Sequence, residues 1–252
     1  MHILVTRPEP DASQMRAQIE AMGHSADVAP LLVITVDAPS DAALQGRDGL
    51  VVTSRNGLRA LERASDLRAL LGRPLFVVGR GTAAAARALG FKDVIIGPAT
   101  AKDLVPLIVD RMKGAHGTRG IAPREVNLLH LSGDKISFDL VPPLAEHGLR
   151  LDRATVYRSQ PADRLLPEVQ GALSRGRYDG VVLMSPLTAE TFVHLVEREG
   201  LADAAAHPAY LCLSAGIAER VDGLKPGRVL VAPKPTAEDM LALVGQLAAL
   251  SE

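Results

Sequence analysis

The chain has 252 residues, of which 47% are hydrophobic and 23% charged, and its formal net charge at pH 7 is -1. This composition is typical of a globular protein with one large domain or two medium ones. Nucleic-acid partners need a basic field or aromatic stacking platforms, and a chain with 3% aromatic residues, no Trp and no basic excess offers neither.

The first ten residues, MHILVTRPEP, lack the charged region and long apolar stretch of a signal peptide. No apolar run reaches the ~18 residues that a membrane span needs. We therefore expect a cytoplasmic protein without a membrane partner. The single cysteine, Cys212, excludes an intramolecular disulfide and a thiolate zinc cluster. Its surroundings, AYLCLS, predict a buried strand residue rather than a nucleophile.

Short apolar runs rich in Val, Leu and Ile recur along the chain, and each is followed by a turn and a helical pattern. Continuous runs of this kind predict parallel strands covered by helices on both faces. The predicted strands are 2–6, 48–53, 75–78, 93–96, 126–131, 179–183, 209–213 and 228–232. The clearest helices are 82–89 and 236–250, in which Thr82 and Thr236 are predicted to be N-caps.

The two halves of the chain resemble each other. GLVVTSRNGLRAL at 49–61 matches GVVLMSPLTAETF at 180–192, so that Ser54 aligns with Ser185. PATAKDLVPLI at 98–108 matches KPTAEDMLALV at 234–244, and LVTRPE at 4–9 matches LHLSGD at 129–134 more weakly. The period is too long for a solenoid, so the pattern favours two duplicated α/β domains over chance similarity of βα units.

Two β-rich stretches that end in Pro, 30–39 and 151–161, interrupt this rhythm at equivalent places in the two halves. Pairing them would make a two-stranded connector. The chain would then begin in one domain, cross to build the second, and cross back. Two independent, consecutive domains remain the alternative.

Familiar catalytic motifs find little support. The seven His are scattered without helical i, i+4 pairs, so no metal site is predicted, and G-x-S-x-G and the P-loop are absent. GRGTAA at 79–84 follows a strand and opens a helix, as a dinucleotide fingerprint would. However, Pro98 stands where the acidic ribose ligand is expected, and the duplicate LSAGIA at 213–218 lacks the first two glycines in register.

Small polar and basic residues follow the predicted strands. In open α/β sheets, ligands bind beyond the carboxyl ends of strands, where helix N-termini favour carboxylates or phosphates. Helix capping is the ordinary role of each Ser or Thr alone, but together these residues favour an anion-binding cleft. The candidate substrate-binding residues are Arg7, Ser54, Arg55, Thr82, Ser132, Gly133, Ser185 and Ser214.

The order and spacing of these segments resemble the uroporphyrinogen-III synthase family over the whole chain. The similar segments are ILVTRP, DGLVVTSRNGLRAL, FVVGRGTAAAARALG, LLHLSGD, DRATVYRS, DGVVLMSPLTAETF and APKPTAEDMLALV. The resemblance implies two similar parallel-sheet α/β domains joined by a two-stranded antiparallel connector, with the active-site cleft between them. It places the discontinuous domain at 1–34 and 162–252, the second at 40–150, and the connector at 30–39 and 151–161.

The resemblance also implies the substrate, hydroxymethylbilane, a linear tetrapyrrole with eight carboxylates that is dehydrated and closed with one pyrrole inverted. It implies no cofactor and no metal. Tyr157 matches the tyrosine proposed as proton donor, and a phenol with a reference pKa of ~10 stays protonated at neutral pH. Gly216 stands where the family often has a second Thr, for which Ser214 is the nearest hydroxyl.

We expect a monomer, and the sequence leaves open whether the bilane-producing enzyme makes transient contact. The alternatives are a non-catalytic two-domain binding protein for anions or small molecules, and a nucleotide-dependent α/β enzyme that would use GRGTAA.

Overall fold

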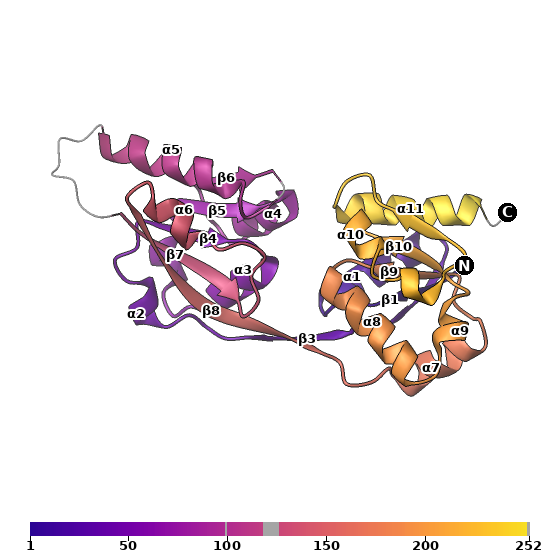
Figure 1. Cartoon of the computed structure of the whole chain (residues 1–252). Helices are drawn as coiled ribbons and strands as arrows, with labels where there is room; N and C mark the ends of the chain where they lie inside the picture. Colours follow the sequence, from indigo (N-terminus) through magenta and orange to yellow (C-terminus); the bar gives the residue numbers. More distant parts are fainter. Residues whose placement is uncertain (99, 118–125, 251–252) are drawn as a thin grey trace. The chain divides into compact units, whose positions relative to one another are not determined.

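A computed structural model describes residues 1–98, 100–117 and 126–250 (Figure 1). Its contacts divide the chain into two compact units. Unit 1 comprises Met1–Ile34 and Gln160–Glu252, and unit 2 comprises Thr35–Ser159. Residues 118–125 of the predicted domain 40–150, and the last two residues of the chain, lie outside the described residues.

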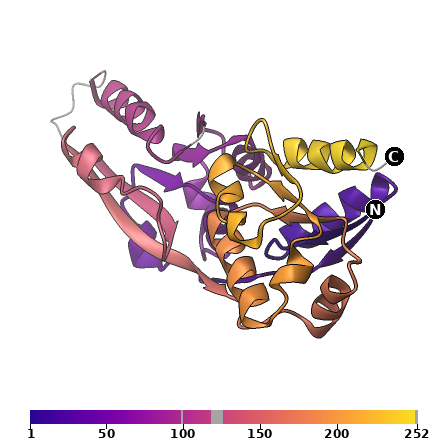
Figure 2. The same ribbon diagram turned by 45° about the vertical axis from the view of Figure 1, so that its right-hand side comes forward.

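Unit 1 is built on a parallel sheet in the order β11-β10-β9-β1-β2. Its strands are β1 (His2–Val5), β2 (Ser25–Val28), β9 (Gly180–Leu183), β10 (Ala209–Cys212) and β11 (Val229–Val231). One face packs against α1 (Asp11–Ala21) and α11 (Ala237–Ala249), the yellow helix of Figures 1 and 2. The other face packs against α7 (Pro167–Ser174), α8 (Pro186–Arg198), α9 (Ala202–Ala205), α10 (Ala215–Ala218) and the turn η2 (Asp222–Leu224).

Unit 2 is built on a sheet in the order β3-β8-β7-β4-β5-β6. The strands of this sheet are β3 (Leu32–Val36), β4 (Gly49–Val52), β5 (Leu75–Val78), β6 (Val94–Gly97), β7 (Val126–Gly133) and β8 (Leu149–Pro161). The start of β3 and the end of β8 extend into unit 1. One face carries α2 (Asp41–Leu44), α3 (Arg55–Glu62), η1 (Leu67–Leu70) and α4 (Arg80–Ala88). The other carries α5 (Leu104–Gly117) and α6 (Val141–Ala145). Both central sheets are therefore covered on both faces, which explains why their strands are continuous apolar runs.

The two sheets have the same internal order. The series β2-β1-β9-β10-β11 in unit 1 corresponds to β8-β7-β4-β5-β6 in unit 2. Gly180 begins β9 and Gly49 begins β4, as the alignment of the two halves predicts. The repeat in the sequence is therefore a repeat of topology, and the predicted α/β class with parallel sheets is confirmed.

Strand β3 pairs with the end of β8. The Asp37 N–H donates to the Val156 carbonyl at 2.8 Å, and the Ala162 N–H donates to the Leu31 carbonyl at 2.9 Å. The partner number falls as the residue number rises, so this ladder is antiparallel. The sequence assigned 151–161 to the connector alone, but β8 first pairs in parallel with β7 from Leu149 onward.

The apolar runs located the strands to within a residue or two, and β2 was missed because its sequence SADV carries no such run. The N-cap predicted at Thr236 is confirmed, because its side chain accepts a hydrogen bond from the Asp239 N–H at 3.0 Å. The N-cap predicted at Thr82 is wrong. Helix α4 begins at Arg80, and Gly79 precedes it with φ 76°, a conformation that glycine adopts without strain.

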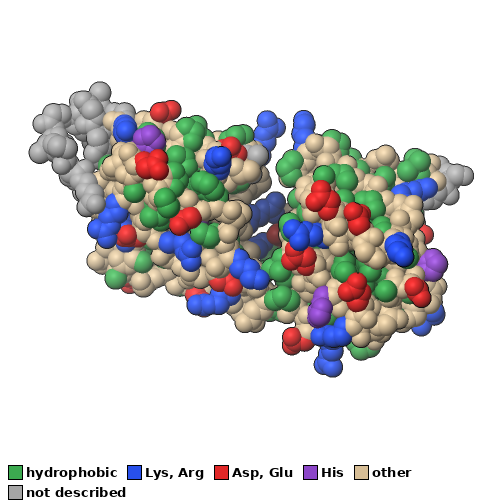
Figure 3. Space-filling view, in the orientation of Figure 1, with side chains coloured by type: hydrophobic (Ala, Val, Ile, Leu, Met, Phe, Trp, Pro, Cys, Tyr) green, Lys and Arg blue, Asp and Glu red, His purple; other side chains and the backbone are tan. Residues whose placement is uncertain are grey.

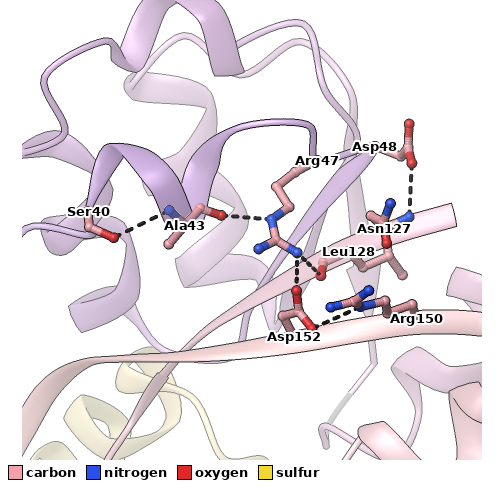
Figure 4. A network of polar contacts seen from close by, with 8 residues as sticks. All are labelled: Ser40, Ala43, Arg47, Asp48, Asn127, Leu128, Arg150 and Asp152. Atoms are coloured by element: carbon pink, nitrogen blue, oxygen red, sulfur yellow. Dashed lines mark hydrogen bonds and ion pairs between the residues drawn. The ribbon is translucent and has the colours of Figure 1, made fainter.

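A polar network holds the amino ends of three strands of unit 2 (Figure 4). Arg47 donates to the Ala43 carbonyl at 2.7 Å and to Asp152 of β8 at 2.5 Å, while the Asn127 N–H donates to Asp48 at 2.9 Å. Arg150 bonds the second carboxylate oxygen of Asp152 at 3.2 Å. These contacts fix β4, β7 and β8 at the edge opposite to their carboxyl ends.

Within the described ranges, no helix combines the length and apolar character that crossing a bilayer requires. Cys212 is buried in β10, as predicted, and burial raises the pKa of its thiol to about 12.

Helix α3 approaches the sheet of unit 2 closely at Gly57. A methyl group there would lie 2.9 Å from both the Leu131 carbonyl oxygen and a methyl of Val52. We expect Gly57→Ala to lower the free energy of unfolding by about 1–3 kcal/mol, because overpacking forces the backbone to shift.

Gly245 in α11 is the matched control, since a methyl group there meets only Met22, at 3.7 Å. Gly245→Ala should leave stability unchanged or raise it by about 0.5–1 kcal/mol, the helix-propensity gain. Urea unfolding of both variants is the measurement. Equal effects would contradict a special packing constraint at Gly57.

Candidate functional site

The carboxyl ends of the parallel strands of unit 2 meet at one edge, and a cavity of about 360 Å³ opens there. Open α/β sheets bind their ligands at this edge. The lining combines apolar and polar groups: Thr53, Ser54, Val78, Thr100, Ala101, His130, Lys135, Ile136, Ser137, Phe138 and Tyr157. Two of the predicted site residues, Ser54 and Tyr157, are among them.

Tyr157 follows an irregularity in β8. Ser132 is in register with Thr155, but the next residue, Gly133, is in register with Tyr157, so β8 carries one extra residue. A one-residue shift moves the following side chain to the opposite face of a sheet. Leu149 and Leu151 accordingly pack toward α5 and α6, whereas Tyr157 packs on the face of α3 and α4.

The phenol of Tyr157 forms hydrogen bonds with the Ser54 side chain and the Gly133 backbone. Burial raises its pKa above the ordinary value, although these two bonds lower it in part. The ring lies so close to Gly133 that a methyl group there would be 2.5 Å from the Tyr157 ring. Tyr157, Ser54 and Gly133 therefore form one contact group, with the phenol protonated at neutral pH.

Ser54 also has the capping role that its position suggests. It is the N-cap of α3, and its hydroxyl accepts from the Asn56 N–H at 3.3 Å. The next residue, Arg55, is half-buried and lies against the start of α4, where its guanidinium would be 2.9 Å from a methyl group on Gly81. That guanidinium occupies the space beside the second glycine of GRGTAA, where a dinucleotide fingerprint needs room for a pyrophosphate.

Two predicted contact residues are buried instead of facing a turn. Thr82 lies in the first turn of α4 and is 8% exposed. Ser132 lies inside β7, is 1% exposed, and its hydroxyl donates to the Gly133 carbonyl at 3.1 Å. Both side chains therefore lie inside unit 2 and not on its surface.

The remaining candidates lie in unit 1, at the carboxyl ends of neighbouring strands β1, β9 and β10. Arg7 is half-buried and donates to Asp11 at 3.4 Å. Ser185 is the N-cap of α8, where it accepts from the Thr188 N–H at 3.1 Å. Ser214 is exposed at the N-cap position of α10 and forms no side-chain capping bond.

Sequence reasoning missed His130, Thr53 and Lys135. His130 is 2% exposed, and its Nε2 lies 3.4 Å from the Thr53 hydroxyl. Burial, aided by Arg153, lowers its pKa to about 4, while Asp139 opposes this shift. The available signal was a titratable residue inside the apolar run NLLHL, which ordinary core packing does not require.

In the part of the chain that the structure describes, no group of three or more His, Cys, Asp or Glu side chains could hold a metal ion. Charges of both signs are interspersed over the face shown in Figure 3, in keeping with the small net charge. The arrangement in unit 2 can donate a proton from a phenol and bind carboxylates through hydroxyls and Lys135.

Comparison with known proteins identifies one family. The family model described as uroporphyrinogen-III synthase HemD matches residues 13–242. A uroporphyrinogen-III synthetase from Helicobacter pylori has 18% identity and a TM-score of 0.61, with 98% of this chain and 99% of that chain covered. A mutant uroporphyrinogen III synthase from Thermus thermophilus has 19% identity and a TM-score of 0.57, with 99% of each chain covered. At these identities, the two structures show a shared fold.

His130 should make the protein sensitive to mild acid. Its pKa is about 4 in the folded protein and 6.5 in the unfolded chain, so the unfolded chain binds a proton that the folded one excludes. Stability should therefore fall as the pH drops from about 6.5 to 4, with about 2 kcal/mol lost between pH 7 and pH 4.5 through this residue.

Urea unfolding of wild type and His130→Val at both pH values isolates this contribution, since all other groups are shared. The variant should lose about 2 kcal/mol less than wild type. Parallel pH dependences would show that His130 is not held neutral.

Proposed function

This chain belongs to the uroporphyrinogen-III synthase family, a family of tetrapyrrole biosynthesis, and we propose that it converts hydroxymethylbilane into uroporphyrinogen III. The reaction loses water and closes the macrocycle with the terminal pyrrole inverted, which makes the protein a cyclising hydro-lyase. The family match over residues 13–242 carries this proposal. We further propose that the protein works as a cytoplasmic monomer.

We propose that Tyr157 starts the reaction by donating a proton to the departing hydroxyl of the substrate. Its phenol borders the cavity and has a raised pKa, so it is a protonated donor at neutral pH. The substrate hydroxyl leaves as water, and the resulting azafulvene cation is attacked by the terminal pyrrole at its substituted carbon. The spiro intermediate fragments and recloses the other way round. Loss of a proton from the ring carbon then restores the phenol, so that water is the net by-product.

Most of the catalytic effect in this proposal is conformational. Uncatalysed closure gives the uninverted isomer, so the protein must determine which carbon reacts by holding the substrate in one geometry. The mixed lining of the cavity suits this task. Val78, Ala101 and Phe138 offer apolar surface to a pyrrole face, while Ser54 and Lys135 offer donors to its carboxylates.

Further carboxylate contacts are proposed at the other candidate positions. Arg55 would serve in unit 2, where Gly133 holds the Tyr157 phenol and the buried Thr82 and Ser132 support the strand ends. Arg7, Ser185 and Ser214 would serve in unit 1, where two of them begin helices. Helix N-termini favour anions, and each such contact contributes roughly 0.3–1 kcal/mol at exposed sites.

The direct test is incubation with freshly generated hydroxymethylbilane, followed by oxidation and separation of the porphyrin isomers. We expect the type III isomer to form faster than spontaneous closure. Type I isomer alone, at the spontaneous rate, would contradict the proposed function. That result would return attention to a binding protein or a nucleotide-dependent enzyme, neither of which the observations favour.

Removal of the proposed proton donor should slow the reaction without changing its product. General acids typically contribute ~100- to 10,000-fold, but this hydroxyl leaves readily and the substrate's own carboxylates can deliver protons. We therefore expect Tyr157→Phe to lower kcat by about 100-fold or less, with the type III isomer still formed. Rate and isomer ratio are measured together.

Tyr178→Phe is the matched control, since it removes a phenol that is bonded to Asp27 in unit 1, at 2.8 Å. It should retain the wild-type rate. A wild-type rate in Tyr157→Phe as well would reduce Tyr157 to a packing residue.

Lys135 should contribute charge to substrate binding. It is exposed at the cavity rim, and exposed ion pairs contribute about 0.2–1 kcal/mol, so Lys135→Ala should raise KM about 2- to 5-fold. The effect should shrink as salt is added. Lys92 is the control, because it is exposed just before β6, at the amino ends of the strands. Equal KM values for Lys135→Ala and Lys92→Ala would remove Lys135 from the site.

A further inference from the structure

The duplication lets one unit serve as a reference for the other. Ile3 of β1 is in register with Gly180 of β9, and Leu128 of β7 is in register with Gly49 of β4. Two residues beyond Ile3 and Leu128, Val5 therefore corresponds to His130. Four residues beyond the two glycines, Met184 corresponds to Thr53.

The same two positions are apolar in unit 1 and polar in unit 2. Val5 is fully buried and His130 is 2% exposed, so the burial is equal and only the chemistry differs. The fold therefore does not require polar side chains at these two positions. Burying an imidazole disfavours its charged form, as its lowered pKa records, so packing alone does not account for His130.

The polar pair in unit 2 lies where a ligand would meet it. His130 and Thr53 both line the cavity, and their side chains are 3.4 Å apart. Among the described residues, Thr53 is the hydrogen-bond partner of the imidazole, through Nε2. With Nε2 donating to the Thr53 hydroxyl, Nδ1 keeps its lone pair as an acceptor.

A tetrapyrrole presents two kinds of polar group. Its carboxylates need donors, which Lys135, Ser54 and the other hydroxyls of the lining supply. Its pyrrole N–H groups need acceptors once they leave water, because an unpaired buried donor is costly. A neutral imidazole provides an acceptor and, being uncharged, does not compete with Lys135 for a carboxylate.

We propose, as an extension of the proposed function, that His130, positioned by Thr53, accepts a hydrogen bond from a pyrrole N–H of the substrate bound in this cavity. Its volume, about 360 Å³, lies at the lower end of the ~300–1,000 Å³ usual for small-molecule sites. The occupant is therefore one substituted pyrrole rather than the whole tetrapyrrole. His130 thus fixes how the ring that enters this cavity is turned.

The test compares variants that keep or remove the acceptor. His130→Val copies unit 1 and removes it, whereas His130→Asn keeps an amide oxygen near the position of Nδ1. A neutral hydrogen bond has a net effect of roughly 2- to 12-fold on an equilibrium, so His130→Val should raise KM for hydroxymethylbilane about 10-fold. His130→Asn should stay within about threefold of wild type, and kcat should change little in either variant.

Thr53→Val gives a second, independent measurement, since it removes only the hydroxyl that positions the ring. It should raise KM less than His130→Val does. The double variant should be no worse than His130→Val alone, because residues acting as one unit are not additive. Circular dichroism and urea unfolding establish that each variant is folded before its kinetics are compared.

The possible outcomes distinguish a failure of the role of His130 from a failure of the proposed function. Wild type that forms type III isomer, with His130→Val at the wild-type KM, overturns this inference alone. Equal impairment of the folded Val and Asn variants, or an effect confined to kcat, also overturns it. Wild type that forms no type III isomer overturns the proposed function and this inference together.

Discussion

The candidate site depends on one close contact between two strands, in which the ring of Tyr157 lies directly over Gly133. Any side chain at Gly133 would be within 2.5 Å of that ring. The extra residue in β8 is the other half of the constraint, since a regular strand would turn Tyr157 to the face of α5 and α6. The glycine, the irregular strand and the cap at Ser54 together place a protonated phenol at the strand-end edge.

The duplicated fold shows which positions of such a site the framework itself does not require. Each unit has a five-strand series in the same order, with apolar clusters on both faces. Unit 1 keeps Val5 and Met184 at positions where unit 2 has His130 and Thr53. The apolar clusters on the two faces of each sheet stabilise the fold. A few positions at the strand ends can therefore hold functional side chains instead of apolar ones.

Sequence reasoning identified what depends on local pattern. Apolar runs located most strands, and the repeat gave the shared topology, because buried parallel strands record burial directly in their composition. It failed where long-range geometry decides. The short strand SADV at β2 owes its place to pairing with β1, and α4 starts at Arg80 after Gly79, whose positive φ no Thr pattern reveals. Tyr157 was identified from a resemblance, while His130 was overlooked because a buried His looks like core until its cavity is known.

The most direct test of this account is a crystal structure of the protein with uroporphyrinogen III bound. We expect one pyrrole ring in the cavity of unit 2, with the Tyr157 hydroxyl near a ring-bridging carbon and a pyrrole N–H within about 3.2 Å of the His130 imidazole. An empty cavity, with the macrocycle bound elsewhere on an active protein, would contradict it.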